Sequence, residues 1–299
     1  MASIRTMNFD HLVGQMVGTS RLLKQLDRGA MSVVFVAFQK SLKRQIAVKI
    51  LPKVLLTPRI AELFQQEAEA AAFLSHPSII PVYEVGESED FLYFTMQLIK
   101  GNSLAYYIRQ ARRNVLPSKR MLPVKTALRI ILKVLDALDY ANKLGVVHRD
   151  IKPRNILIEG HSKRPIITDF GVARSYGGSD DDNRILVGTP TYMAPEQIIS
   201  GIVDGRADVY ATGVMLLEML CGGLPYPPYD SAVKLLKIKL RLQDRIFSKT
   251  PSQVNPNADA DLDEIVLRAV AYNQDRRYES CREFAKDLEE WMSKRSPAA

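Results

Sequence analysis

The feature that most constrains the fold of this 299-residue chain is a change of hydrophobic periodicity near residue 100. Before this point, short apolar runs rich in Val, Ile and Phe recur, which is typical of β-strands. The runs lie at residues 33–36, 46–50, 81–85 and 91–94. One stretch between them, residues 60–74, is rich in Ala and Glu without Gly or Pro, and predicts a single helix.

After residue 101 the pattern becomes helical at residues 105–113, 124–144, 213–220, 262–271 and 281–292, with short strand-like runs at 156–158 and 165–167. This order predicts an α+β protein of two lobes, a small antiparallel sheet with one main helix and a larger, mostly helical lobe. We expect a leader (1–15), the first lobe (16–96), a connection (97–102), the second lobe (103–292) and a tail (293–299). Clefts between lobes commonly hold ligands.

Composition narrows the class of protein but not its partner. With 46% hydrophobic and 25% charged residues, the chain is not intrinsically disordered. A net charge of +8 suits nucleic acid, a membrane surface, a phosphorylated ligand or an acidic substrate, and equally serves solubility alone. Two cysteines make neither a disulfide framework nor a four-thiolate zinc site. There is no apolar run long enough to span a membrane and no secretory signal, so we predict a cytoplasmic protein.

Five short patterns occur in a fixed order along the chain. They are Ile46-Ala47-Val48-Lys49, Glu67, His148-Arg149-Asp150-Ile151-Lys152-Pro153-Arg154-Asn155, Asp169-Phe170-Gly171 and Ala194-Pro195-Glu196. At these residues the chain resembles the eukaryotic-type (Hanks-type) protein kinases, and Met193 to Gln197 looks most like their bacterial serine/threonine branch. The resemblance covers roughly residues 16 to 292 and implies the bilobal protein kinase fold.

The resemblance implies a serine/threonine protein kinase that uses ATP and Mg²⁺ (or Mn²⁺), phosphorylates protein hydroxyls and also phosphorylates itself. Phosphoryl transfer needs an anion held still, its charge neutralised and a hydroxyl aimed in line. In these terms Lys49 binds phosphates, Glu67 holds Lys49, Asp150 orients the substrate hydroxyl, Lys152 stabilises the transferring group, and Asn155 and Asp169 offer oxygens to the metal.

The resemblance also implies an adenine pocket and several scaffold residues. Val34, Ala47 and Leu157 would sandwich the ring, Met96 would close its back, and Gln97 to Ile99 would offer backbone hydrogen bonds. His148 and Phe170 would pack together, Asp208 would anchor the catalytic loop, Arg277 would pair with Glu196, and Thr189 would shape the acceptor site.

Two departures keep a pseudokinase or scaffold open as an alternative. In the glycine-rich loop only Gly29 and Val34 match the family pattern, and Asp27 brings a carboxylate toward the polyphosphate. We predict weakened ATP affinity with retained turnover, unless Asp27 points to solvent or is neutralised by Arg28. Ala71, one turn after Glu67, is smaller than the family's usual residue, so the active arrangement is expected to be less tightly packed.

The segment after Asp169 suggests a mode of regulation. Arg149 and Arg174 are basic residues of the kind that hold an activation-loop phosphate in the family. Residues 180–188 contain no Ser or Thr but include Asp180, Asp181 and Asp182, which either stand in for a phosphate or form a solvated acidic loop. Ser175 and Ser179 remain candidate phosphosites.

A basic stretch lies between residues 109 and 133. It contains eight cations and no acid: Arg109, Arg112, Arg113, Lys119, Arg120, Lys125, Arg129 and Lys133. It suits an acidic docking partner or substrate or an anionic membrane surface, and is equally compatible with a solvated helical face. Because few aromatic residues are interleaved, we expect no nucleic-acid binding. The chain is also compatible with the cytoplasmic part of a longer, membrane-anchored protein.

Overall fold

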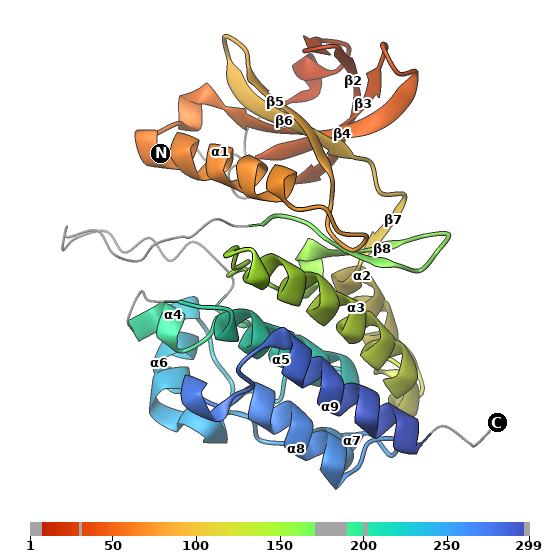
Figure 1. Ribbon diagram of the computed structural model, residues 1–299, viewed down its shortest axis with the longest axis vertical. Coiled ribbons are helices and arrows are strands. Elements are labelled where there is room, and N and C mark those ends of the chain that lie inside the picture. The colour runs from red at the N-terminus through yellow and green to blue at the C-terminus, as the bar shows by residue number, and fades with distance from the viewer. Residues whose placement is uncertain (1–7, 30–31, 171–189, 200–202, 296–299) are drawn as a thin grey trace. The chain divides into compact units, whose positions relative to one another are not determined.

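The computed structural model describes residues 8–29, 32–170, 190–199 and 203–295, and divides after Lys100 into two compact units (Figure 1). The first unit is a sheet with one long helix, and the second is mostly helical. The predicted α+β class is therefore confirmed. The division lies inside residues 97–102, while the exact bounds of the other segments stay predictions.

The first unit is an antiparallel sheet of six strands in the order β1-β2-β3-β4-β6-β5. The strands are β1 (Met16–Val17), β2 (Ser20–Arg28), β3 (Val33–Gln39), β4 (Arg44–Pro52), β5 (Val82–Glu87) and β6 (Phe91–Gln97). The helix α1 (Pro58–Phe73) begins at Thr57, whose hydroxyl accepts a hydrogen bond from the Ile60 amide at 3.2 Å. Pro58 occupies the first turn, where a missing N–H costs nothing.

The core of the first unit starts earlier than Met16, where we predicted the lobe to begin. Phe9 and Leu12 are each 5% exposed and belong to the same apolar cluster as Leu22, Phe35 and Ile50. Phe9 directly precedes a single 3₁₀ turn (Asp10–Leu12) and Leu12 ends it, which places both side chains on one face. One turn is too short to give a periodic pattern, so residues 8–15 read as a featureless leader.

The second unit is built around α5 (Arg206–Cys221), in which every residue from Ala207 to Leu220 is buried. A helix that is buried on all sides forms the core of its unit. The helices α3 (Val124–Lys143), α8 (Ala260–Ala269) and α9 (Cys281–Lys294) pack around it. The others are α2 (Leu104–Arg112), α4 (Glu196–Ile199), α6 (Ala232–Leu242) and α7 (Pro251–Val254).

A small sheet of three strands positions the segments that contain Asn155 and Asp169, the two predicted metal ligands. Its strands β7 (Gly101–Ser103), β8 (Ile156–Glu159) and β9 (Pro165–Ile167) are antiparallel, with β8 in the middle. Asn155 directly precedes β8 and Asp169 lies two residues after β9. The hairpin β8–β9 therefore holds the two predicted metal ligands at the same end of the sheet.

Besides several short elements, the sequence prediction missed two longer ones, β2 and α6. The strand β2 was missed because most of its side chains are polar and exposed, which hides the alternation of a half-buried strand. The helix α6 was missed because lysines and arginines dilute its apolar stripe. Gly171, Arg174, Ser175, Ser179, the three aspartates at 180–182 and Thr189 lie outside the described residues. Within the described ranges, no helix has the length and apolar character needed to cross a bilayer.

Candidate active site

In the first unit, Lys49 and Glu67 form an ion pair between β4 and α1. The Lys49 Nζ lies 2.5 Å from the Glu67 Oε1, and the two side chains are only 10% and 17% exposed. The Phe94 ring, 5.5 Å from the ammonium, covers another side of Lys49. Because Lys49 lies on an inner strand with neighbours on both sides, its backbone is rigid and its side chain is directed toward the helix.

The residues predicted to receive adenine gather on adjacent strands of the same unit. Ala47 is paired in register with Val36 on one side and Met96 on the other, and both Ala47 and Met96 are buried. Val34 is half-buried opposite Lys49, and Ile99 is buried.

Two further residues of that prediction have separate surroundings. The Gln97 amide donates to the Pro81 carbonyl at 3.0 Å, so this N–H is used within the protein. Leu157 lies in the second unit, half-buried on β8.

The remnant of the glycine-rich loop is closed by its own backbone. The Gly29 amide donates to the Ser32 carbonyl at 2.8 Å. A side chain on Gly29 would meet Ser32 atoms at 3.3 Å, which explains why glycine suits this position. The Asp27 side chain is exposed and accepts a hydrogen bond from the Arg28 amide at 2.8 Å, while the Arg28 guanidinium contacts Gln25 and the Phe9 ring.

In the second unit, Asp150, Lys152 and Asn155 form one cluster. The Lys152 Nζ lies 2.7 Å from the Asp150 Oδ2. The Asn155 Nδ2 donates to the Asp150 carbonyl at 2.9 Å and lies 3.3 Å from its Oδ2. Asp150 remains 32% exposed at its side chain, so one carboxylate is fixed by a cation and an amide while still facing solvent.

The loop that carries Asp150 is held in a strained conformation by Asp208 at the start of α5. Arg149 has φ 64°, a left-handed conformation that costs a non-glycine residue of order 1 kcal/mol or more. The Asp208 carboxylate accepts from the His148 amide at 2.9 Å and from the Arg149 amide at 2.8 Å. Burial raises the pKa of Asp208, whereas these amide donors favour its charged form.

The Asp169 segment is tied to the same loop. Asp169 also has a positive φ of 57° and is half-buried. The Thr168 amide just before it donates to the Asn155 carbonyl at 2.8 Å. The Phe170 ring just after it packs on the His148 ring with centroids 4.7 Å apart, and a His148 ring nitrogen lies 3.1 Å from the Thr168 carbonyl. Both predicted metal ligands are therefore attached to one rigid loop system.

Residues 190–197 are fastened to the core from several sides. The Arg277 guanidinium forms two hydrogen bonds of 2.7 and 2.8 Å to the Glu196 carboxylate in a fully buried ion pair. The Gln197 side chain donates to the Arg149 carbonyl at 2.8 Å, which links this segment to the catalytic loop. The Tyr192 hydroxyl donates to Glu218, which in turn pairs with Arg112. Burial, followed by the charge of Glu218, raises the pKa of Tyr192.

Sequence reasoning missed three residues at this segment: Gln197, Tyr226 and Lys239. Gln197 is adjacent to a family motif, which was the only signal for it. Tyr226 donates to the Thr191 carbonyl at 2.7 Å, and Lys239 donates to Thr191 and Met193 carbonyls at 2.9 and 2.8 Å. Lys239 stands one helical turn after Leu235 on an apolar face, and that phase could have marked it as buried.

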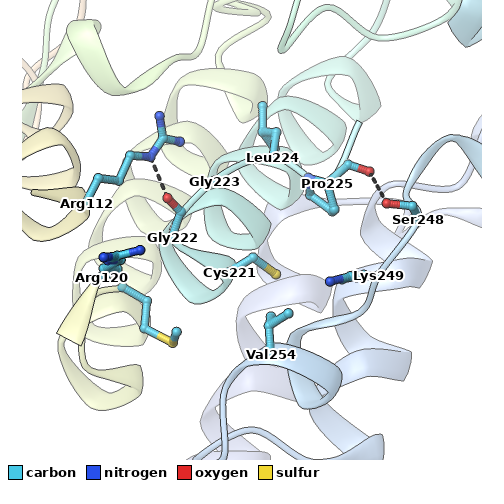
Figure 2. A pocket seen from close by; sticks show the side chains of 11 residues that line it. Arg112, Arg120, Cys221, Gly222, Gly223, Leu224, Pro225, Ser248, Lys249 and Val254 are labelled. Carbon is cyan, nitrogen blue, oxygen red and sulfur yellow. Dashed lines mark hydrogen bonds between the residues drawn. The ribbon is translucent and has the colours of Figure 1, made fainter. Parts of the chain in front are cut away.

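The basic stretch covers the end of α2, the loop that follows and the start of α3, and all eight cations are exposed. Arg112 and Arg120 also line a pocket of about 530 Å³, together with Lys249 from the segment before α7 (Figure 2). Figure 2 shows the two arginines on one side and Lys249 on the other. Among the described residues that line this pocket, none is acidic.

Comparisons with known proteins agree with this geometry. The protein kinase domain family matches residues 20–296. Serine/threonine-protein kinase PknB of Mycobacterium tuberculosis is 35% identical over 268 residues, which cover 87% of this chain and 41% of that protein. Serine/threonine-protein kinase Pkn1 of Myxococcus xanthus is 33% identical over 286 residues, which cover 94% and 39%. The chain thus spans about two fifths of the length of these relatives.

The crystal structure of the Mycobacterium tuberculosis PknI kinase domain has the same fold. It superposes with a TM-score of 0.71 and 28% sequence identity, and the match covers 93% of this chain and 98% of that structure. The predicted kinase fold and the predicted bacterial serine/threonine branch are therefore confirmed. On the family match, the site geometry and these relatives, the chain belongs to the protein kinase domain family.

Proposed function

We propose that this domain transfers the γ-phosphoryl group of ATP to serine and threonine hydroxyls of proteins, including its own. The observation that carries the proposal is the cluster around Asp150, in which one carboxylate contacts both the Lys152 ammonium and the Asn155 amide. The relatives named serine/threonine-protein kinases support the same activity. ATP as the phosphoryl donor is consistent with the predicted cytoplasmic location.

The proposed mechanism assigns one task to each residue of the cluster. Asp150 accepts a hydrogen bond from the substrate hydroxyl and directs it for in-line attack, then takes its proton as the new P–O bond forms. Lys152, already within 2.7 Å of Asp150, is placed to bind an oxygen of the transferring phosphoryl group and to stabilise its charge. In the first unit Lys49, oriented by Glu67, binds the non-transferred phosphates.

A divalent metal suits the donor set of Asp169 and Asn155. Both offer oxygen ligands, which Mg²⁺ and Mn²⁺ prefer, and hydrogen bonding of the Asn155 Nδ2 to Asp150 leaves the amide oxygen as the ligand atom. Bound Mg²⁺ would neutralise charge on the phosphates. Asp169 and Asn155 lie on connected segments, because the Thr168 amide bonds to the Asn155 carbonyl.

The pseudokinase alternative rests on Asp27 and Ala71. Asp27 is exposed and bonded to a backbone amide, so its carboxylate has solvent and a local donor as partners. Ala71 is buried on α1 four residues after Glu67, and the Lys49–Glu67 pair is formed despite the small side chain. Both observations favour an active enzyme over a scaffold.

The test is phosphorylation of a generic protein substrate with radiolabelled ATP, comparing the native chain with Asp150→Asn. Removing the proton acceptor should lower kcat by about 10²- to 10⁴-fold. Glu264→Gln is the matched control, because Glu264 is exposed on α8 away from the cluster. Equal rates for Asp150→Asn and the native chain, or no phosphorylation by any variant, would contradict the proposal.

A second proposed role is docking of an acidic segment of the protein substrate or partner on the basic stretch. The pocket of Figure 2 favours this role, because cations from two separate parts of the chain line one cavity without an acid. Arg112 is already paired with Glu218 at 2.5 Å, so Arg120 and Lys249 carry the charge left to a partner. A concave cavity suits an acidic side chain better than a flat membrane surface.

This docking role is tested with a fluorescein-labelled oligoglutamate peptide and the double variant Arg120→Glu/Lys249→Glu. Charge reversal should weaken binding by about tenfold or more at low salt, and added salt should reduce the difference by screening. Lys237→Glu/Lys286→Glu is the control, since it makes the same change in net charge at exposed sites. Equal losses in both double variants would indicate a net-charge effect only, and preferential binding of phosphatidylserine vesicles would favour a membrane surface.

A further inference from the structure

Lys239 on α6 is a buried cation. It is 2% exposed and ranks among the largest fully buried side chains of the described chain, whereas Lys234 and Lys237 on the same helix are exposed. Lysine is almost never fully buried without a partner, because removing an ammonium from water costs several kcal/mol. Lys239 must therefore make contacts that offset a large desolvation cost.

Among the residues that the structure describes, Lys239 contacts two backbone carbonyls and two aromatic rings. The Lys239 Nζ donates to the Thr191 carbonyl at 2.9 Å and to the Met193 carbonyl at 2.8 Å. The rings of Tyr210 and Tyr226 lie 5.4 and 5.6 Å from the ammonium, within range of cation–π attraction. Within the described part of the chain, no carboxylate is ion-paired with Lys239.

The two phenols that face Lys239 stay neutral near pH 7. Burial raises the pKa of Tyr210 and of Tyr226, so both phenols stay neutral. Beyond them, Arg277 lies over the Tyr210 ring and is paired with Glu196. Burial lowers the pKa of Lys239 itself to about 7, so its charge changes between pH 6 and 8.

The two carbonyls held by Lys239 belong to a segment that is fixed next to the catalytic loop. At the far end of this segment, Gln197 donates to the Arg149 carbonyl, one residue before Asp150. At the near end, Tyr226 donates to the same Thr191 carbonyl that Lys239 binds. Lys239 therefore bridges two points of one short turn segment, and the segment is anchored to α6 at one end and to the catalytic loop at the other.

We propose that Lys239 is a positioning residue for protein substrate: it fixes the backbone of residues 191–193 so that this segment can present the acceptor peptide to Asp150. The inference rests on the proposed kinase function and adds one positioning residue, Lys239, to it. Lys239 acts through the Thr191 and Met193 carbonyls and has no role in binding ATP. Loss of Lys239 should therefore raise the KM for peptide and leave the KM for ATP nearly unchanged.

The first experiment reads the segment directly and needs no catalysis. Hydrogen–deuterium exchange of residues 190–199 is compared in the native chain, Lys239→Met and Lys237→Met. Methionine keeps the length and apolar stem of lysine but removes its donors, so exchange in this segment should rise about tenfold or more, as for the loss of hydrogen bonds to a charged group. Lys237→Met, on the exposed face of α6, should leave exchange unchanged.

The second experiment uses steady-state kinetics with a peptide substrate. Lys239→Met should raise the KM for peptide about tenfold, with the KM for ATP within about twofold of the native value. In the native chain the KM for peptide should change between pH 6 and 8, and this step should be absent from Lys239→Met. Unchanged exchange and an unchanged peptide KM in Lys239→Met would overturn the proposal.

Tyr226→Phe keeps the proposal testable if Lys239→Met does not fold. This variant removes only the phenol donor to Thr191 and leaves the ring beside the ammonium, so it should raise exchange and the peptide KM in the same direction by a smaller factor. If neither the native chain nor any variant phosphorylates a substrate, the proposed kinase function is wrong. The exchange experiment then still decides whether Lys239 holds the segment.

Discussion

Lys49 and Lys239 are buried lysines, one in each unit, and their charges are balanced in different ways. Lys49 faces a carboxylate, Glu67, at 2.5 Å. Lys239 faces two backbone carbonyls and two tyrosine rings. The first arrangement pairs a full charge with a full charge, and the second distributes the stabilisation over dipoles and ring quadrupoles.

The kind of partner, a carboxylate or backbone carbonyls, determines which part of the protein each lysine can hold in place. The ion pair between Lys49 on β4 and Glu67 on α1 forms only when the helix lies close to the strand, so the position of Lys49 depends on that of α1. Carbonyls belong to the backbone, so an ammonium that binds two of them fixes the path of the main chain. We infer that the first lysine serves ligand charge and the second serves backbone position. The predictions below test this contrast, starting with the largest effect.

The largest effect is expected where a buried cation loses its carboxylate. Arg277 is 0% exposed at its side chain and forms two hydrogen bonds to Glu196. Glu196→Gln should lower the free energy of unfolding by about 3–5 kcal/mol, because it leaves a buried guanidinium without a countercharge. Urea unfolding measures this loss, with Glu264→Gln as the exposed control. A loss below that of Glu67→Gln, whose pair is partly exposed, would contradict the argument from burial.

The second prediction concerns how the free energy of unfolding depends on pH through Lys239, the lysine bound to two carbonyls. Burial lowers the pKa of Lys239 from 10.5 to about 7, so between these values the unfolded chain binds a proton that the folded chain does not. Stability should therefore rise with pH above about 7, by about 2–3 kcal/mol between pH 7 and 9, relative to Lys239→Met.

The pH dependence is measured by urea unfolding at several pH values as a difference between the two chains, which cancels groups common to both. Lys237→Met serves as the control and should follow the native chain. Parallel stability curves for the native chain and Lys239→Met would show that Lys239 keeps an ordinary pKa. In that case the two carbonyls and the two rings would fully offset the cost of removing the ammonium from water.

The third prediction concerns the carboxylate-bound lysine in catalysis. Glu67→Gln removes the carboxylate charge that pairs with the Lys49 ammonium and leaves a neutral amide oxygen as acceptor. We expect this loss to cost about 1.5–3 kcal/mol, or about 10- to 100-fold in kcat/KM for ATP. Glu69→Gln, on the exposed face of α1, is the matched control. Lys239→Met, by contrast, should change the KM for peptide and leave the KM for ATP nearly unchanged. Loss of the same parameter in both variants would remove the distinction between the two lysines.

The smallest effect is expected at Asp27. Its carboxylate is exposed and accepts from the Arg28 amide, so Asp27→Gly should lower the KM for ATP by about threefold at most, because solvent screens exposed charges. Steady-state kinetics at low and high salt measures this change. A tenfold fall in KM would show that Asp27 does oppose the nucleotide, as the degraded glycine-rich loop first suggested.

The sequence determined the parts of this protein that depend on local pattern. The periodicity predicted four strands and the helix α1 to within a few residues, and the spacing of the motifs predicted the residues around Asp150. Lys49, Glu67, Asp150 and Asn155 were identifiable because phosphoryl transfer requires particular functional groups in a particular order. Their assigned roles stay predictions, although the Lys49–Glu67 and Asp150–Lys152 contacts agree with them.

The tertiary structure alone decided the role of residues whose neighbours are distant in sequence. Phe9 and Leu12 join the core of the first unit, although residues 8–15 show no periodic pattern. Lys239 is one of four basic residues in an 11-residue helix, and only its phase, one helical turn after Leu235, distinguishes it from the other three. Only tertiary contacts, with the Tyr210 and Tyr226 rings and with two carbonyls 48 and 46 residues away, enclose this one lysine, because burial is a property of the whole fold.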